Sequence, residues 1–269
     1  MQWVDLVPSE LERLAREEGL CVVPMGCLER HGEHVPFGCD LVIAETIAAR
    51  AAEKTPCVVF PGYFLAQVHE ASCFSGAVNL PQALAVEVLA RVLDGIARNG
   101  FRKIAILNCH GGNTAFLDYF SMSQLDDGHS YVLYVVSPFS ALDKEEEGRL
   151  AALWETRVQG HADEQETSLC MACKPGLVKL ELAERGETRP LERFAHLSAR
   201  GIHNALWWYA RYPENVTGTP SAAGEEKGRA ALEILVNASA RALDAIKEDE
   251  TAPELQREFL RRMRSVGTR

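Results

Sequence analysis

The stretch that decides the fold is "CVVPMGCLERHGEHVPFGCD", residues 21–40. Its first six residues form an apolar run that is typical of a strand buried on both faces of a parallel sheet. The residues that follow include Glu29, His31 and Asp40, which are side chains of types that bind metal ions. In an extended segment, residues two apart point the same way, so Glu29 and His31 can face one centre together. The stretch therefore predicts a buried strand with a polar site behind it.

Working outward, the same kind of apolar run recurs along the chain and alternates with helical patterns. We expect further buried strands at 57–66, 103–108 and 131–136. Asp40 is the expected N-cap of the helix that follows the opening stretch. Helices are expected at 8–19, 40–54, 81–99, 114–125, 222–247 and 252–264.

This alternation predicts an α/β protein with a mostly parallel central sheet and helices on both faces. We expect a single domain over residues 1–269, because the chain shows no repeat and no low-complexity linker. In such sheets, ligands bind beyond the carboxyl ends of the strands. The polar residues that follow the first strand are therefore placed where a site is expected.

Charge and cysteine usage limit the partners and the compartment. The net charge of −10 disfavours binding to nucleic acid and to anionic membranes. No apolar run is long enough for a membrane span, and the first residues lack the basic start of a signal peptide. The eight cysteines show no disulfide spacing, so we expect a cytoplasmic protein. We interpret Cys170 and Cys173 as buried side chains on one helix face rather than as a redox pair.

Three further stretches carry side chains of the same chemistry. The sequence "NCHGGN" at 108–113 directly follows a predicted strand, and its glycines let the backbone turn His110 inward. His161 and Glu166 lie within "GHADEQETS" at 160–168. A weaker signal, "QVHEASCFSG" at 67–76, contains His69 and Glu70.

Together these stretches supply three carboxylates and two imidazoles that suit Zn²⁺, Mn²⁺ or a similar ion. Five such ligands can hold two ions about 3.5–4 Å apart, with one carboxylate shared, and a water between the ions then becomes a hydroxide that attacks a carbonyl carbon. Each histidine taken alone is more typical of a hydrogen-bonded structural residue, so a plain α/β domain with polar loops remains an alternative. The candidate ligands are Glu29, His31, Asp40, His110 and Glu166.

These motifs resemble the creatininase family of metal-dependent amidohydrolases, over roughly residues 21–170 with a weaker echo at 216–232. The resemblance implies a creatininase-like fold and two divalent ions per chain, Zn and/or Mn with Fe as a further option. It also implies a homo-oligomer, often a hexamer. The motifs that carry it are "PMGCLERHGEHVPFGCD", "NCHGGN" and "HADEQETS".

The resemblance also implies a role for each matching residue. The five candidate ligands take the metal-binding positions, and Asp40 is the shared one. His161 is similar to the family's catalytic histidine, a proton shuttle, and Glu166 is assigned to catalysis as well as to the metal. The positions that support the ligands or line the substrate pocket are His34, Asn113, His69 and Glu70.

Some positions depart from the family pattern and bear on the substrate. Cys109 stands where the family usually has glycine, and "FSGAV" at 74–78 replaces a Phe-Pro-Gly-Thr turn. Members that hydrolyse creatinine carry a metal-binding glutamate where this chain has Gly112. We therefore expect cleavage of a non-peptide C–N bond in another small molecule, a cyclic amide or a formamide. The alternatives are a metallopeptidase that processes a short precursor peptide and a non-catalytic family member.

Overall fold

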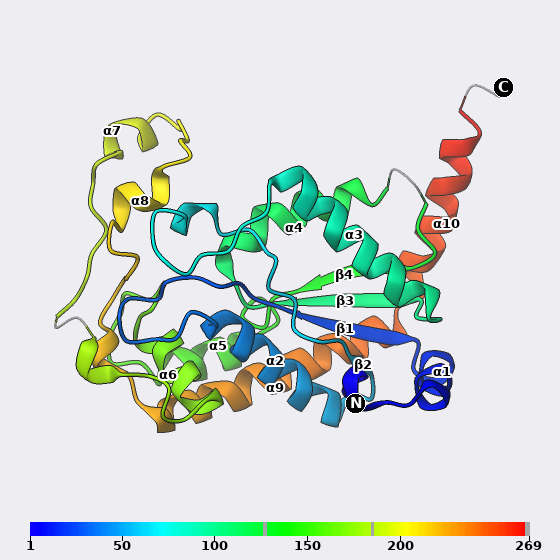
Figure 1. Cartoon of the computed structure of the whole chain (residues 1–269), viewed down its shortest axis with the longest axis horizontal. Helices are drawn as coiled ribbons and strands as arrows, with labels where there is room; N and C mark the ends of the chain where they lie inside the picture. Colours follow the sequence, from blue (N-terminus) through cyan, green and yellow to red (C-terminus); the bar gives the residue numbers. More distant parts are fainter. Residues whose placement is uncertain (126–127, 184–185, 267–269) are drawn as a thin grey trace.

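The computed structural model describes residues 1–125, 128–183 and 186–266, and within them a four-stranded parallel sheet has the order β2-β1-β3-β4 (Figure 1). The central pair, β1 and β3, aligns from Leu20 opposite Lys103 to Met25 opposite Asn108. Both strands therefore end at the same edge of the sheet. The strands are β1 (Leu20–Met25), β2 (Val58–Val59), β3 (Lys103–Asn108) and β4 (Val132–Val136).

Helices cover both faces of this sheet, which confirms the predicted α/β class (Figure 1). One face carries α3 (Gln82–Arg98) and α4 (Thr114–Ser123), and the other carries α2 (Cys39–Lys54) and α9 (Glu225–Glu248). None of the helices in the described ranges is long and apolar enough to cross a membrane. The remaining α-helices are α1 (Pro8–Glu17), α5 (Lys144–Ala151), α6 (Glu164–Cys173), α7 (Ala195–Ser198), α8 (Trp207–Arg211) and α10 (Thr251–Arg264).

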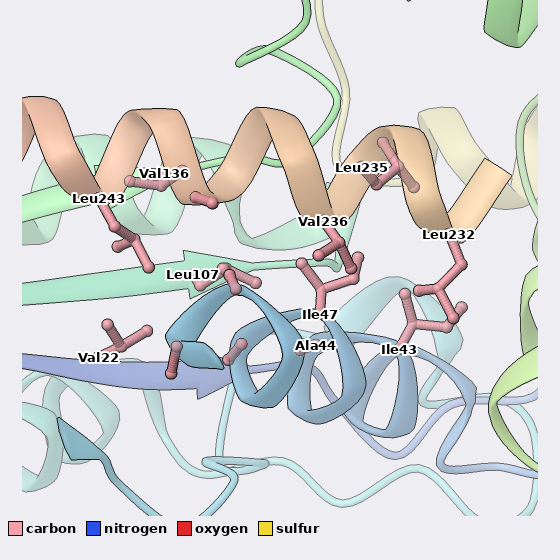
Figure 2. Close-up of a cluster of buried hydrophobic side chains, with 14 of the residues drawn as sticks. Val22, Ile43, Ala44, Ile47, Leu107, Val136, Leu232, Leu235, Val236 and Leu243 are labelled. Carbon is pink, nitrogen blue, oxygen red and sulfur yellow. The ribbon is translucent and has the colours of Figure 1, made fainter. Parts of the chain in front are cut away.

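The first strand shows why the chain folds into these layers. Successive side chains of a strand point to opposite faces, so an apolar run is stable only where both faces are covered. Val22 packs into the cluster shared with α2 and α9, whereas Val23 packs into the cluster on the α3 side. Figure 2 shows the first of these clusters, where Ile47 of α2 and Val236 of α9 meet on the face of the sheet that these two helices cover.

Three expectations about these elements were wrong in detail. The run at 57–66 contributes only the two residues of β2, because Pro61 lacks the N–H that a continuing strand would donate. The strand β4 is not fully buried, since it lies at the edge of the sheet and leaves Val135 43% exposed. The N-cap of α2 is Gly38, so Asp40 lies inside the first turn of the helix and its carboxylate is free for other contacts. The helices expected at 8–19, 40–54, 81–99, 114–125, 222–247 and 252–264 all form.

The close contact between α6 and α9 provides a test of the packing. A Cβ on Gly228 of α9 would lie 1.8 Å from the backbone oxygen of Ser168 in α6. We expect Gly228→Ala to lower the free energy of unfolding by about 1–3 kcal/mol, because the helices must separate. Gly95 of α3 has no atom within 4 Å of such a Cβ. As a control, Gly95→Ala is expected to stabilise the protein by up to about 1 kcal/mol. Equal urea midpoints for the two variants would contradict the close packing.

Candidate metal centre

The five predicted ligands converge at the edge where β1 and β3 end. The segment after β1 supplies Glu29 and His31, and the segment after β3 supplies His110. Asp40 comes from the first turn of α2, and Glu166 from the first turn of α6. All except Glu166 have 5% or less of their surface exposed. The local sequence explains this convergence, because strand ends and helix starts meet at one edge of a parallel sheet.

Asp40 lies between the two histidines and presents one oxygen to each. Its Oδ1 is 3.1 Å from Nε2 of His31, and its Oδ2 is 2.9 Å from Nδ1 of His110. Glu29 Oε2 lies 3.3 Å from the same His110 nitrogen, and Glu166 Oε2 lies 3.5 Å from the same His31 nitrogen. We call Glu29, Asp40 and His110 the first half-site. The second half-site is His31, Asp40 and Glu166.

Backbone carbonyls hold the outer nitrogen of each imidazole. The Nε2 of His110 is 2.9 Å from the carbonyl oxygen of Gln67, and the Nδ1 of His31 is 3.2 Å from that of Glu29. A carbonyl oxygen accepts a hydrogen bond, so each outer nitrogen donates its hydrogen. The inner nitrogen, which faces the carboxylates, is therefore the one that would bind an ion after losing its proton, and this is how metal-binding histidines are usually oriented.

The buried carboxylates and imidazoles of this centre shift one another's pKa values. Burial would raise the pKa of Asp40, but His31 and His110 hold it well below its usual range. Burial would likewise lower the pKa of His110, but Glu29 and Asp40 raise it to about 9. Burial raises the pKa of Glu166 to about 8. Protons on these groups therefore balance charge that bound cations would otherwise balance.

This balance predicts how pH and metal affect stability. The folded-state pKa of His110 lies above its ordinary 6.5, so its stabilising contribution is complete below that pH and is lost as pH rises through about 9. The raised pKa of Glu166 acts in the same direction up to about 8. We expect metal-free protein to lose stability between about pH 6 and pH 9, and added Zn²⁺ to raise the Tm more at the upper end. Thermal unfolding with and without a chelator measures both effects. If Zn²⁺ raised the Tm by the same amount at both ends of this pH range, the ligand assignment would be contradicted.

His161 contacts both half-sites. Its Nε2 lies 3.6 Å from Glu29 Oε1, and its Nδ1 lies 3.7 Å from Glu166 Oε2. Its ring is 4.1 Å from that of His31, centre to centre. Burial lowers the pKa of His161, so its imidazole is neutral near neutral pH and able to accept a proton.

Sequence reasoning missed Asn215, which ties this histidine to the ligands. Its Nδ2 donates to the carbonyl oxygen of Arg30 at 2.6 Å and to Glu29 Oε1 at 3.2 Å, and lies 3.1 Å from Nε2 of His161. Its Oδ1 accepts from the indole of Trp208 at 2.5 Å. No local pattern marks Asn215, because it lies 186 residues from Glu29 in the chain.

Backbone strain is concentrated beside His161. Across the described ranges, the non-glycine residues with positive φ are Ala162 at 53° and Asn215 at 55°. This conformation costs about 1–3 kcal/mol for a residue other than glycine, although asparagine tolerates it better than most. One of these residues follows His161 in the chain, and the other touches its ring.

Two substitutions at Asn215 separate its side chain from its backbone. Both Asn215→Ala and Asn215→Gly remove the amide, but only glycine accepts the positive φ without strain. We expect the alanine variant to lose about 1–3 kcal/mol of stability, because buried groups lose their hydrogen bonds. The glycine variant should lose less. Urea unfolding of metal-free protein measures the difference between the two variants. If the glycine variant were no more stable than the alanine variant, the positive φ at residue 215 would not be a source of strain.

Two other predicted residues lie behind the ligands. His34 is buried, and its Nε2 is 3.0 Å from the hydroxyl of Thr167, the residue after Glu166. Asn113 accepts from the backbone of Gln67 at 2.9 Å and so fixes the segment whose carbonyl holds His110. Each therefore supports the centre through a neighbouring residue.

His69 and Glu70 instead line a cavity of about 830 Å³. The Oε1 of Glu70 is 3.9 Å from Nε2 of His110. A Cβ on Gly112 would lie 2.3 Å from this oxygen, so the Glu70 carboxylate fills the space beside Gly112. A smaller cavity of about 300 Å³ is lined by both His110 and Glu166.

Cys27 is a second residue that sequence reasoning missed, and it lies in the first half-site. Its Sγ is 3.2 Å from Asp40 Oδ2 and 3.6 Å from Glu29 Oε2. Burial and the Asp40 and Glu29 carboxylates raise the pKa of this thiol well above its usual range. Residues two apart in an extended segment point to the same side, so the pattern that groups Glu29 with His31 also includes Cys27.

The fold is thus that of a parallel α/β protein with a buried cluster of carboxylates and imidazoles, the side-chain types of a metal centre, at the carboxyl edge of its sheet. The family model for creatininase, described as creatinine amidohydrolase, matches residues 5–243, and the chain belongs to this family of hydrolases. The predicted resemblance is thereby confirmed.

Sequence comparison also finds individual proteins that are similar to this chain. It is 28% identical to the 3-dehydro-scyllo-inosose hydrolase of Thermotoga maritima, over 84% of this chain and 76% of that protein. It is 26% identical to the creatinine amidohydrolase of Pseudomonas putida, over 88% of this chain and 92% of that protein. A shorter match, 34% identical over 34% of this chain and 41% of the relative, is to the 2-amino-5-formylamino-6-ribosylaminopyrimidin-4(3H)-one 5'-monophosphate deformylase of Methanocaldococcus infernus.

Solved structures agree on the fold. A crystal structure of creatinine amidohydrolase (creatininase) superposes with a TM-score of 0.74 at 24% identity, over 92% of this chain and 98% of that chain. Two more structures with a TM-score of 0.74 and 23% identity, each covering 92% of this chain, are described as a mutant creatininase of Zn-Zn type and as creatininase Mn. They cover 98% and 99% of their own chains.

Proposed function

We propose that this chain hydrolyses a non-peptide C–N bond in a small molecule, a cyclic amide or a formamide, with two divalent ions. The observation that carries the proposal is Asp40, which offers one carboxylate oxygen to each half-site. The names of two relatives, an amidohydrolase and a deformylase, support the type of bond. The Zn-Zn and Mn forms of creatininase support zinc and manganese as the ions.

The donor atoms fit such ions in type and in spacing. Each half-site offers one imidazole nitrogen and two carboxylate oxygens, and neighbouring donors lie 2.9–3.5 Å apart. Ligands bound to one ion at about 2.0–2.2 Å are separated by similar distances. When bound, divalent ions lower the pKa of water and polarise a carbonyl oxygen.

In this proposal, His161 transfers the proton of the attacking water, and Glu166 and Asn215 position it. The neutral imidazole of His161 stands between Glu29 and Glu166, where it can take a proton from the attacking water and deliver it to the leaving nitrogen. Glu166 accepts a hydrogen bond from the backbone of Ala162 at 2.7 Å, which fixes its carboxylate beside His161. The side-chain amide of Asn215 contacts the Nε2 of the same imidazole.

The cavity argues for a small substrate other than creatinine. Gly112 cannot supply the glutamate expected of creatinine-hydrolysing members, and the Glu70 carboxylate occupies the adjacent space. A carboxylate at this position favours a substrate that presents N–H or O–H groups. The neighbouring cavity of about 830 Å³ lies within the range of small-molecule sites.

A substrate panel tests this function. Protein loaded with Zn²⁺ or Mn²⁺ is incubated with lactams, cyclic ureides, formamides, creatinine and short peptides, and the products are identified by mass spectrometry. We expect turnover of an amide or formamide and none of creatinine. A parallel panel with the Asp40→Asn variant controls for contaminating hydrolases. Cleavage confined to peptides, or confined to creatinine, would overturn the proposal.

A further inference from the structure

We propose that Cys27 is a thiolate ligand in the first half-site and that it makes this half-site zinc-selective. The inference rests on the proposed function, because it concerns the same metal centre. It also goes further, since it makes the two half-sites chemically different. Cys27 is fully buried, and its sulfur faces two ligands of one half-site.

The geometry supports a set of four donors. One ligand atom each from Cys27, Glu29, Asp40 and His110 lies within 4.8 Å of all the others. The sulfur is 3.2 Å from Asp40 Oδ2 and 3.6 Å from Glu29 Oε2, and the imidazole is 2.9 Å and 3.3 Å from the same oxygens. In tetrahedral zinc sites, bond lengths of about 2.0–2.3 Å separate the ligand atoms by about 3.3–3.6 Å. These four distances are close to the edge lengths of such a site, and all four donor atoms lie within 4.8 Å of one another.

The second half-site lacks this thiol. Cys39 lies within 4.8 Å of donors from His31 and Asp40, but its sulfur faces the backbone oxygen of Glu166 at 3.9 Å. The second half-site therefore has three donors, which leaves a position for water or substrate, as in catalytic zinc sites. The first half-site, with four protein donors, leaves no such position and is expected to hold its ion more firmly than the second.

A thiolate changes which ion binds. Carboxylate and imidazole ligands accept both Zn²⁺ and Mn²⁺, whereas a thiolate is a soft ligand that favours Zn²⁺ over Mn²⁺. We infer that the first half-site retains zinc and that the second exchanges its ion more readily. The alternative role for Cys27 is a thiol that only donates a hydrogen bond to Asp40. A serine would reproduce that role, but it would not reproduce the thiolate.

Cobalt substitution distinguishes the two roles without any substrate. Co²⁺ bound to a thiolate shows a near-ultraviolet sulfur-to-cobalt charge-transfer band, and bound Co²⁺ shows visible d–d bands whatever its ligands. We expect the charge-transfer band in wild-type protein and in Cys39→Ser, and its loss in Cys27→Ser while the d–d bands remain. In competition between Zn²⁺ and Mn²⁺, Cys27→Ser should lose about tenfold or more of the zinc preference.

The wild-type spectrum decides the question even if a variant fails to fold. Bound cobalt without a charge-transfer band would overturn the role of Cys27 and leave the proposed function intact. A band that survives in Cys27→Ser but disappears in Cys39→Ser would assign the sulfur to the second half-site instead. No binding of Co²⁺ to the wild type would defeat both the inference and the proposed function.

Discussion

Asp40→Asn is expected to abolish retention of both metal ions, because the two half-sites share this one carboxylate. Oδ1 faces His31 and Oδ2 faces His110, so each half-site loses a charged donor. Wild-type protein is expected to retain about two divalent ions per chain. Asparagine preserves the shape of the side chain but presents only one oxygen and carries no charge. The ion content of the variant should therefore approach zero.

Elemental mass spectrometry after dialysis against metal-free buffer measures this content. Asp118→Asn is the matched control, since Asp118 lines both cavities and is exposed but belongs to neither half-site. Circular dichroism in the presence of a chelator shows whether the Asp40 variant still folds. Retention of both ions by a folded Asp40→Asn protein would contradict a shared carboxylate.

His161→Ala is expected to lower kcat/KM by about 10²–10⁴-fold on the amide or formamide substrate, because proton transfer loses its imidazole. Its metal content should stay close to that of wild type, since His161 is in neither half-site. Kinetics and ion content are measured on the same preparation, so that loss of chemistry is separated from loss of metal.

His203→Ala is the matched control for this substitution. His203 also lines the larger cavity but is exposed, and its ring lies beside Trp207 rather than beside the ligands. Its removal should change kcat only slightly. If the His161 variant kept full activity, or if its loss of activity followed its loss of metal, the proton-transfer role would be wrong.

The parts of the fold that follow from short-range patterns were predictable. The strand β3 has the bounds expected for it, Lys103–Asn108, because its apolar run is followed by the polar Asn108 and then by the turn that contains Gly111 and Gly112. The failure at β2 came from weighing the apolar run of 57–66 above Pro61, which cannot donate a ladder hydrogen bond. The burial of β4 depended on its place at the sheet edge, which no local pattern reveals.

The same division applies to the candidate site. The five predicted ligands all lie at strand ends or in first helical turns, where the topology of a parallel sheet brings them together. Asp40 lies beside them but does not cap its helix, which was the role expected for it. Asn215 could not be anticipated, since its contacts are tertiary and its own segment carries no recognisable pattern.

The two half-sites are completed at different points along the chain. Every donor of the first half-site, Cys27 included, lies within residues 27–110. The second half-site also requires Glu166, which is carried by α6, and α6 packs against α9 from the other end of the sequence. During synthesis from the N-terminus, a ribosome-bound chain therefore exposes the complete donor set of the first half-site before any of α6 exists. The order of translation therefore makes the donors of the first half-site available before those of the second.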